Sequence, residues 1–378
     1  METRLLTHRP EAGWSSPLPA GLDSARTLVA AFAPTAYAER DDFWASLAAA
    51  FPRSHVLSCS SVGAIAGEHV VDDTAVAVVV RFERVEVTSA AVPIQALEMS
   101  RRAGQKLGRA LADGDPHTVI VVADGMHAQG SELVQGIAGA LPAGTRIVGG
   151  MAGDGAACQR TWTLVDGVPR SGWVTAVALS GPVEVGAAAR GGWRAFGTAR
   201  RVSRAEGNVV LELDGRPALA VYAEQLGDLA RGLPAAAERF PLAVRVDANE
   251  GAELMRTVQA IDTDAQSLTC AGDVPQGALV RLARAGHEQL IDSAERAAIA
   301  AKPRDGAPVL ALAISCASRR EALGDLCDDE AAVAHAALPP GSTQLGFYAY
   351  GEIAPSARAA CDLHNQAFSL VTLRELLS

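Results

Sequence analysis

The sequence predicts a mixed α/β protein of two domains, each a mixed, largely antiparallel sheet with packed helices. Three observations lead to this prediction. The 378 residues exceed the size at which one hydrophobic core keeps growing, which favours two domains. Buried apolar runs alternate with segments that carry apolar residues at helical spacing. Short strand-like segments separated by glycine turns occupy residues 160–204 and imply antiparallel hairpins.

The first half of the chain reads as an ordered domain that follows a loose start. Residues 1–24 are rich in Pro, Gly and Ser and lack periodicity, so we expect a flexible N-terminal arm and a first domain over 25–231. The elements expected in this half are strands at 26–34 and 55–61, a strand pair within 74–90, strands at 117–125, 145–150 and 208–215, and helices at 41–51, 96–113, 131–141 and 216–230.

The second half repeats the same mixture. The stretch 232–241, rich in Pro and Ala, predicts a linker, and the second domain follows over 242–378. The elements expected in it are strands at 242–246, 255–261, 267–272, 279–285, 309–315, 345–353 and 368–373, with helices at 287–301 and 328–338. The buried strands 119–125 and 309–315 resemble each other faintly, which indicates a duplicated architecture.

Composition and charge exclude several classes of function. The formal net charge is -10 and no basic tract occurs, so the chain lacks the phosphate-neutralising stripe of a nucleic-acid-binding protein. No apolar run has the length of a secretory leader or a membrane span, so we expect a cytoplasmic protein without a membrane partner. The six cysteines are scattered without a C-x-x-C pair, which indicates neither a disulfide framework nor a four-cysteine zinc site.

Residues that can bind a ligand or take part in catalysis follow several of the predicted buried strands. Ligands bind where the ends of such strands converge, so these stretches are the candidate ligand-binding site. The candidate residues are Cys59, Ser60, Ser61, Asp124, Gly125, Gly149, Gly150, Gly153, Asp154, Cys316, Arg319, Tyr350, Glu352, His364 and Asn365. For each of them an ordinary packing or turn role is the competing interpretation.

Two of these stretches admit a sharper chemical interpretation. The glycines of 149–155 let backbone N–H groups approach an anion, but the stretch has neither the lysine of a P-loop nor the G-x-G-x-x-G spacing. Cys59 lies between serines and Cys316 precedes two arginines, so either thiol is a candidate nucleophile of a cysteine-dependent enzyme. Packing is favoured over catalysis, because the sequence does not position a base beside either thiol.

Several motifs in order resemble the FIST family over roughly residues 25–375. They are SCSSVGAIAGE, VVADG, VGGMAGD, GWRAFG, LELDGRPALAVY, SCASR, YGEIAP and LHNQAF. Glu68 comes later than in the family's usual turn, and Gln366-Ala367 replaces its usual threonine. The resemblance implies a bacterial signal-transduction protein with FIST N-terminal and C-terminal domains, sensing small ligands such as amino acids, and does not imply catalysis.

The resemblance leaves alternatives open. One branch of the family contains haem-based nitric-oxide sensors that act on a partner histidine kinase, and His364 and His127 are the candidate axial ligands here. Another alternative is an interaction scaffold without a ligand pocket. We expect no metal other than this haem iron. Our first hypothesis is one interdomain pocket lined by residues 59–61, 124–125, 149–154, 316–319 and 350–365, with a hinge between the domains.

Overall fold

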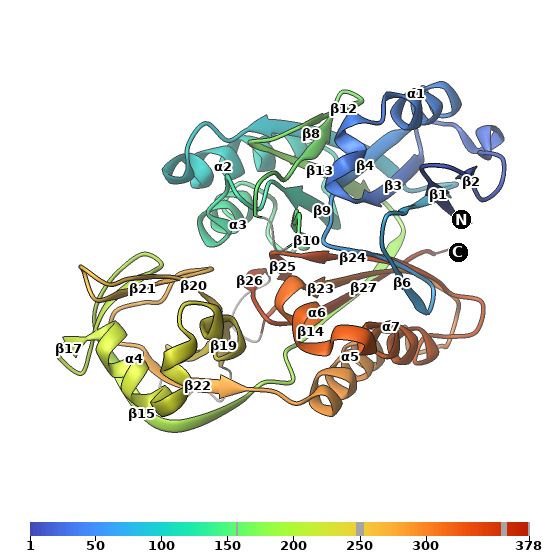
Figure 1. Cartoon of the computed structure of the whole chain (residues 1–378). Coiled ribbons are helices and arrows are strands. Elements are labelled where there is room, and N and C mark those ends of the chain that lie inside the picture. The colour runs from blue at the N-terminus through green and yellow to red at the C-terminus, as the bar shows by residue number, and fades with distance from the viewer. Residues whose placement is uncertain (156–157, 247–252, 357–360, 377–378) are drawn as a thin grey trace.

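The computed structural model describes residues 1–155, 158–246, 253–356 and 361–376. Part of the predicted loop 350–365, residues 357–360, lies outside the described residues. The predicted mixed α/β class is confirmed, because mixed sheets are covered by helices. Three sheets share one strand arrangement and surround a common core, and a further body of strands lies to their side, at the lower left of Figure 1.

The first sheet contains a strand that the sequence did not predict. Within it, β3 runs parallel to β4 and antiparallel to β7, and β7 pairs with β1. The elements of this region are β1 (Glu2–Arg9), β2 (Gly13–Trp14), η1 (Ala20–Leu22), β3 (Thr27–Ala33), η2 (Thr35–Glu39), α1 (Asp41–Ala50), β4 (His55–Ser60) and β7 (Ala75–Arg81). The prediction of a flexible arm over 1–24 is therefore wrong, because β1 is paired along its length with β7.

The second sheet repeats this arrangement. Here β9 runs parallel to β10 and antiparallel to β13, and β13 pairs with β8. Its elements are β8 (Glu86–Pro93), η3 (Leu97–Met99), α2 (Ser100–Leu111), β9 (Thr118–Ala123), α3 (Gly130–Ala138), β10 (Arg146–Met151) and β13 (Trp173–Ser180).

The third sheet repeats it again in the second half of the chain. β23 runs parallel to β24 and antiparallel to β27, and β27 pairs with β14. Its elements are β14 (Val183–Arg190), α5 (His287–Ala301), β23 (Leu310–Cys316), α6 (Ala317–Leu323), η6 (Gly324–Leu326), α7 (Cys327–Ala336), β24 (Thr343–Ala349) and β27 (Phe368–Glu375). The resemblance between 119–125 and 309–315 thus reflects three equivalent units, whose central strands are β3, β9 and β23.

Each unit donates a hairpin to a neighbouring sheet. After its parallel pair of strands, each chain segment leaves its own sheet and pairs with the outer parallel strand of another unit. The donated hairpins are β5 (Ala64–Ala66) with β6 (His69–Val71), which pairs with β24; β11 (Thr163–Val165) with β12 (Val168–Arg170), which pairs with β4; and β25 (Gly351–Ala354) with β26 (Asp362–His364), which pairs with β10. The exchange is cyclic, so each sheet includes strands from two units.

The apolar faces of the three sheets enclose one core. Phe32 from the first sheet, Val122 from the second and Ile314 from the third belong to the same buried cluster. The rings of Phe32 and Phe347 stack across two sheets, with their centroids 4.3 Å apart. Helices cover the outer faces: α1 on the first sheet, α2 and α3 on the second, α5 and α7 on the third.

The fourth body is formed by residues on both sides of the predicted linker. Its elements are β15 (Arg194–Glu206), β16 (Val209–Leu213), β17 (Arg216–Pro217), α4 (Ala218–Leu226), η4 (Gly227–Gly232), η5 (Ala235–Arg239), β18 (Leu242–Arg245), β19 (Leu254–Arg256), β20 (Val258–Asp262), β21 (Ser267–Cys270) and β22 (Leu279–Arg284). β22 pairs with β15 on one side and with β18 on the other. Because this sheet continues across 232–241, that stretch does not separate two bodies, and the linker prediction is wrong in this respect.

The fourth body is joined to the second sheet and to the start of α3 by polar contacts. Arg256 donates to the Leu363 carbonyl of β26 at 3.0 Å, and the Gln129 amide donates to Asp273 at 2.6 Å. Within the part of the chain that the structure describes, no helix is both long and apolar enough to cross a bilayer.

Candidate functional site

The predicted site stretches do converge, because the three units meet where their parallel strands end. Three backbone hydrogen bonds close a ring there: Val62 N–H donates to the Tyr348 carbonyl at 3.2 Å, Gly153 N–H to Ser60 at 3.2 Å, and Tyr350 N–H to Met151 at 3.0 Å. Each bond links one unit to the next. We call these six residues the central ring.

The serines and the cysteine at the end of β4 have structural roles. Cys59 is fully buried in the common core. The Ser60 hydroxyl accepts the N–H of Trp162 at 3.1 Å, and the Ser61 hydroxyl accepts the N–H of Gly63 at 3.0 Å. None of these three side chains presents a free polar group to a cavity, so their assignment to a ligand site is corrected to a structural role.

Asp124 holds the loops after β9 instead of a ligand. Its carboxylate is fully buried and accepts the N–H groups of Met126 at 2.9 Å and Gly172 at 2.6 Å, together with the Thr161 hydroxyl. The His127 ring nitrogen Nδ1 lies 3.1 Å from it. Such a set of donors occupies both carboxylate oxygens and leaves little capacity for a ligand.

The glycine stretch after β10 is packed against protein atoms. A Cβ at Gly149 would lie 1.8 Å from the Val121 carbonyl oxygen, and one at Gly150 3.0 Å from the side chain of Ile314. A Cβ at Gly153 would lie 2.6 Å from Val62. Gly149 therefore allows close approach between two strands of one unit, and Gly150 and Gly153 allow close approach between units, so the predicted role of these glycines in binding a ligand is corrected.

Two further predicted residues close the same region. The Tyr350 hydroxyl donates to Asp154, whose other oxygen accepts the N–H groups of Gln159 at 2.6 Å and Arg160 at 2.7 Å. Gly125 packs beneath Tyr350, because a Cβ there would lie 2.9 Å from its ring. Gly125 and Tyr350 also line a hollow of about 440 Å³ that faces the fourth body.

Arg319 forms a buried ion pair. Its guanidinium donates to Glu330 at 2.5 Å and 2.8 Å, and both side chains are fully buried. The same guanidinium donates to the carbonyls of Gly191 at 2.6 Å and Leu290 at 2.8 Å. Arg319 therefore positions the segment around Gly191, and its predicted direct contact with a ligand is corrected.

Two of the remaining predicted residues, His364 and Asn365, line a separate and larger hollow. It has a volume of about 710 Å³ and lies between β14 of the third sheet and the hairpin β25–β26, which belongs to the second sheet. We call it the β14 hollow. Its lining comprises residues 187–193, 253–255, Ala300, Pro355, Ser356, His364, Asn365 and Ala367. One interdomain pocket lined by all the predicted loops is therefore replaced by a packed ring with hollows beside it.

Asn365 is the least satisfied polar side chain of this wall. Only 2% of it is exposed, and neither its amide oxygen nor its amide nitrogen makes a hydrogen bond to a described residue. The next residue, Gln366, has a φ of 62°, a conformation that non-glycine residues adopt at a cost. Gln366 is held there by bonds from its amide to the Glu238 carbonyl at 3.0 Å and the Thr257 hydroxyl at 3.1 Å.

Glu352 lies on β25, opposite Gly150 of β10 on one side and opposite His364 of β26 on the other. It is fully buried; one carboxyl oxygen accepts the N–H of Ala367 at 3.1 Å, and the other has no hydrogen-bond partner among the described residues. Burial raises the pKa of Glu352 well above its usual value, although the bond from Ala367 and the charge of Arg319 partly oppose this shift. Burial therefore favours the protonated, neutral form of Glu352, whose O–H can donate.

Neither candidate nucleophile has the surroundings of a reactive thiol. Burial raises the pKa of Cys59 and that of Cys316, whereas a nucleophilic cysteine needs a lowered pKa. Within the described residues, no hydrogen bond joins either thiol to a histidine. The geometry gives no support to the enzyme alternative.

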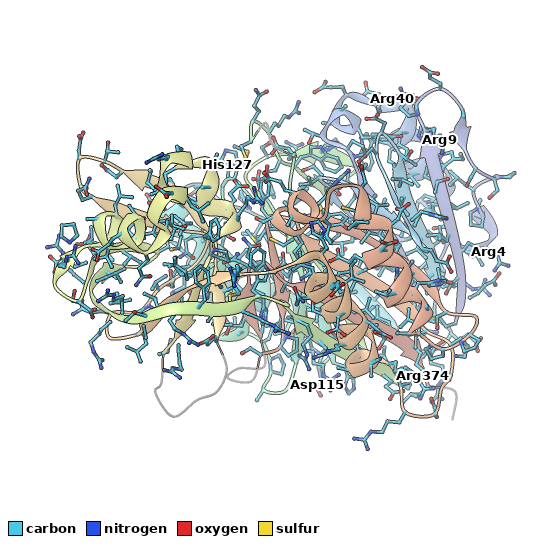
Figure 2. The ribbon with its side chains drawn as sticks, turned by 60° about the horizontal axis from the view of Figure 1, so that its bottom comes forward. Arg4, Arg9, Arg40, Asp115, His127 and Arg374 are labelled. Carbon is cyan, nitrogen blue, oxygen red and sulfur yellow. The ribbon has the colours of Figure 1, made fainter. Side chains whose placement is uncertain are left out.

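The surroundings of the two candidate axial histidines do not favour haem. His127, labelled in Figure 2, is half exposed, and its Nδ1 lies 3.1 Å from the Asp124 carboxylate. His364 lies on the wall of the β14 hollow, but its Nε2 is 3.2 Å from the Ala354 carbonyl. The wall around it also includes Asn365, Arg190 and Glu253, whereas haem requires a largely apolar pocket.

Comparison with known proteins decides the family. Residues 27–216 match the FIST N domain and residues 218–355 match the FIST C domain. The chain belongs to the FIST family. FIST domains are sensory, ligand-binding domains of signalling proteins. The boundary between the two matches falls at residue 217, within β17, ahead of the stretch 232–241.

Other comparisons add little. None of the curated proteins matches this FIST protein. Among solved structures, cyanuric acid hydrolase from A. caulinodans is similar at 10% sequence identity and a TM-score of 0.39, covering 100% of this chain and 99% of that chain. A likeness at that score carries no argument about fold or activity.

The sequence indicated only one wall of the β14 hollow of this FIST protein. His364 and Asn365 were found because they lie in a tract dense in polar side chains. The opposite wall, with Ala187, Ala189 and Trp193, was missed, because VEVGAAAR is typical of an ordinary strand. The GGW run at 191–193 was the available signal, since paired glycines before a tryptophan are unusual in a simple strand connection.

Proposed function

We propose that this FIST protein is a sensor whose small-molecule ligand binds in the β14 hollow and whose signal passes to a partner protein, such as a histidine kinase. The observation that carries the proposal is the Asn365 amide, which lies buried in the wall of the hollow without a hydrogen bond to a described residue. Buried polar groups without partners are rare in folded proteins, and a bound ligand is one explanation for them.

The energetics favour a polar ligand. A buried amide that loses water without gaining a protein partner costs about 1–3 kcal/mol for each group, and a complementary ligand recovers that cost. Neither the donor nor the acceptor of Asn365 is bonded to a described residue, so a ligand that satisfies both needs an acceptor and a donor close together. Burial lowers the pKa of His364, so this neighbour is neutral at pH 7. Amino acids, which the family resemblance implies, meet these requirements.

Asn365→Leu tests the proposal. Leucine has nearly the shape of asparagine without its polar groups, so we expect ligand affinity to fall at least tenfold, the equivalent of about one lost hydrogen bond to a neutral group. The free energy of unfolding of the unliganded variant should equal or exceed that of the wild type, because an unpaired amide is removed. Amino acids and related metabolites would be screened by thermal shift, and affinities then measured by calorimetry.

Ser58→Ala is the matched control, because it also removes a buried hydroxyl that lacks a partner among the described residues but does not line the hollow. Ser58→Ala should bind as the wild type does. Equal ligand affinity in wild type and Asn365→Leu would place the ligand elsewhere.

The haem alternative uses the same hollow, with His364 as the axial ligand. It ranks second, because its support is only the position of His364 on the wall. An absorption spectrum of protein produced with haem supplied tests it. A stoichiometric Soret band that shifts with nitric oxide and disappears in His364→Ala would establish this alternative in place of a metabolite ligand.

A further inference from the structure

β14 is an edge strand that faces a cleft. It pairs with β27 on one side, and no described strand pairs with its other side. The β14 hollow runs along residues 187–190, and a second hollow of about 480 Å³ runs along residues 184–187. Together these hollows follow most of the length of the strand, which spans about 26 Å at 3.3 Å per residue.

The register shows which backbone groups point into the cleft. Leu376 N–H donates to the Pro182 carbonyl at 2.7 Å, which makes that pair a hydrogen-bonded one. In an antiparallel ladder such pairs alternate, so the residues at even positions of β14 bond to β27. The N–H and C=O groups of Val185, Ala187 and Ala189 therefore point away from β27, toward the open side.

β14 has little of the usual protection of an exposed edge. Natural edge strands are kept short, carry charged side chains or proline, contain a bulge, or are covered by another element. The charged residues of β14, Glu184 and Arg190, lie near its two ends. β14 has eight residues, pairs with β27 without a bulge, and contains neither proline nor lysine. Its middle is Gly186, Ala187, Ala188 and Ala189, whose small side chains allow another backbone to approach.

One end of the cleft is positively charged. Arg146, Lys302 and Arg304 line the hollow beside Glu184, and none of them forms an ion pair with a described carboxylate. The two carboxylates in the same lining, Glu184 and Asp305, are both paired with Arg374. Figure 2 shows Arg374 at the edge of this part of the molecule. The charge left over at this end is therefore positive, in a chain whose net charge is -10.

We infer that β14 is the docking site for an extended segment of a partner protein, which adds to the third sheet as a further strand. Its backbone would bond to Val185, Ala187 and Ala189, and acidic residues at one end would lie over Arg146, Lys302 and Arg304. Strand addition supplies affinity through the backbone, and side-chain contacts supply specificity. The segment would cover Ala187 and Ala189, which also line the β14 hollow. A ligand in that hollow would compete with the segment, and this last point alone rests on the proposed function.

A random eight-residue peptide library displayed on phage tests the inference. It would be panned against the wild type, against Ala187→Pro, which removes one outward N–H, and against Ala187→Ser, which keeps it. Proline is tolerated where the N–H of an edge strand faces outward, and thermal unfolding would verify that each variant is folded. We expect wild type and Ala187→Ser to enrich peptides with acidic residues at one end, and Ala187→Pro to enrich none of them.

A second measurement needs no variant. An enriched peptide and its copy N-methylated at alternate residues would be compared by fluorescence polarisation, and methylation of the bonding positions should weaken binding at least tenfold. No enrichment by the wild type, the same peptides with Ala187→Pro, or equal affinity after methylation in both alternate frames would overturn the inference. Metabolite binding that depends on Asn365, in a protein that enriches no peptide, would overturn strand addition and leave the proposed function intact.

Discussion

At the scale of single residues, the site depends on groups that the protein leaves incompletely bonded. Glu352 and Asn365 each bury polar atoms that have no described partner, whereas Asp124 and Arg319, equally buried, are fully occupied by hydrogen bonds. Burial depth alone therefore does not distinguish a ligand site from a structural centre. The distinguishing quantity is the bonding capacity that remains after folding.

The raised pKa of Glu352 predicts how the free energy of unfolding depends on pH. Its pKa is raised in the folded protein, so the folded state holds the proton more tightly than the unfolded state does. The stabilisation by this group is complete below the unfolded carboxyl pKa of 4.5 and is lost progressively as the pH rises above it. Glu352→Gln keeps a neutral side chain at every pH. We therefore expect the unfolding free energy of Glu352→Gln, relative to wild type, to increase from pH 5 to pH 8 in urea titrations.

Other carboxyl groups titrate in both proteins and cancel in this difference. Glu295→Gln serves as the control, because that side chain is exposed on α5. A difference between Glu352→Gln and wild type that stays constant with pH would show that Glu352 is ionised in the folded protein.

At the scale of secondary structure elements, close approach between strands depends on glycine. In β10, Gly149 has a φ of 141° and its α-carbon faces the Val121 carbonyl of β9. Since a backbone atom cannot move aside as a flexible side chain can, the strand pair leaves no room for a methyl group. The glycines of this stretch are therefore required for packing, although a run of glycines also resembles an anion-binding loop.

Gly149→Ala should therefore destabilise the protein by about 2–4 kcal/mol, from steric overlap and an unfavourable φ together. Gly144→Ala is the matched control, because Gly144 also has a positive φ, 93°, but has open space around its α-carbon. It should cost about 1 kcal/mol. Urea unfolding of both variants provides the comparison, and equal costs would mean that β10 can shift away from β9.

The fold was predictable element by element but not in its connections. Buried runs such as β9 and β23 were predicted because they are continuously apolar. β1 was missed, because ETRLLTHR mixes charged and apolar residues and its partner β7 lies some seventy positions away. α6 was missed, because SCASRR has the polar composition of a loop. The exchange of hairpins could not be inferred, since a local pattern does not reveal which distant strand it pairs with. Of the site, His364 and Asn365 were predicted and the β14 wall was not.

At the scale of the whole molecule, the cyclic exchange of hairpins makes the two halves of the chain interdependent. The second sheet needs β25 and β26 from residues 351–364, and β5 and β6 need β24. A fragment of residues 1–216, which contains the FIST N domain, exposes the face of the common core that Ile314 and Phe347 cover.

This fragment should not fold on its own. We expect it to lack near-ultraviolet circular dichroism and to aggregate, and we expect native-like signal to return when residues 217–378 are added during refolding. As a control, the full chain cleaved at an inserted protease site near Gly215 after folding should keep its spectrum, because Gly215 lies in an exposed turn. A cooperative thermal transition in the 1–216 fragment alone would contradict this prediction.

The central ring has a mechanical consequence for signalling. The β14 hollow lies between two sheets, and those sheets share the common core as well as the ring, so widening the hollow would shear tightly packed apolar side chains. Protein interiors of this kind resist compression and sliding. The walls formed by these two sheets therefore resist separation, whereas the wall formed by residues 253–255 belongs to the fourth body, outside the common core. Such a receptor would signal through which of its surfaces is occupied, without separation of the two sheets.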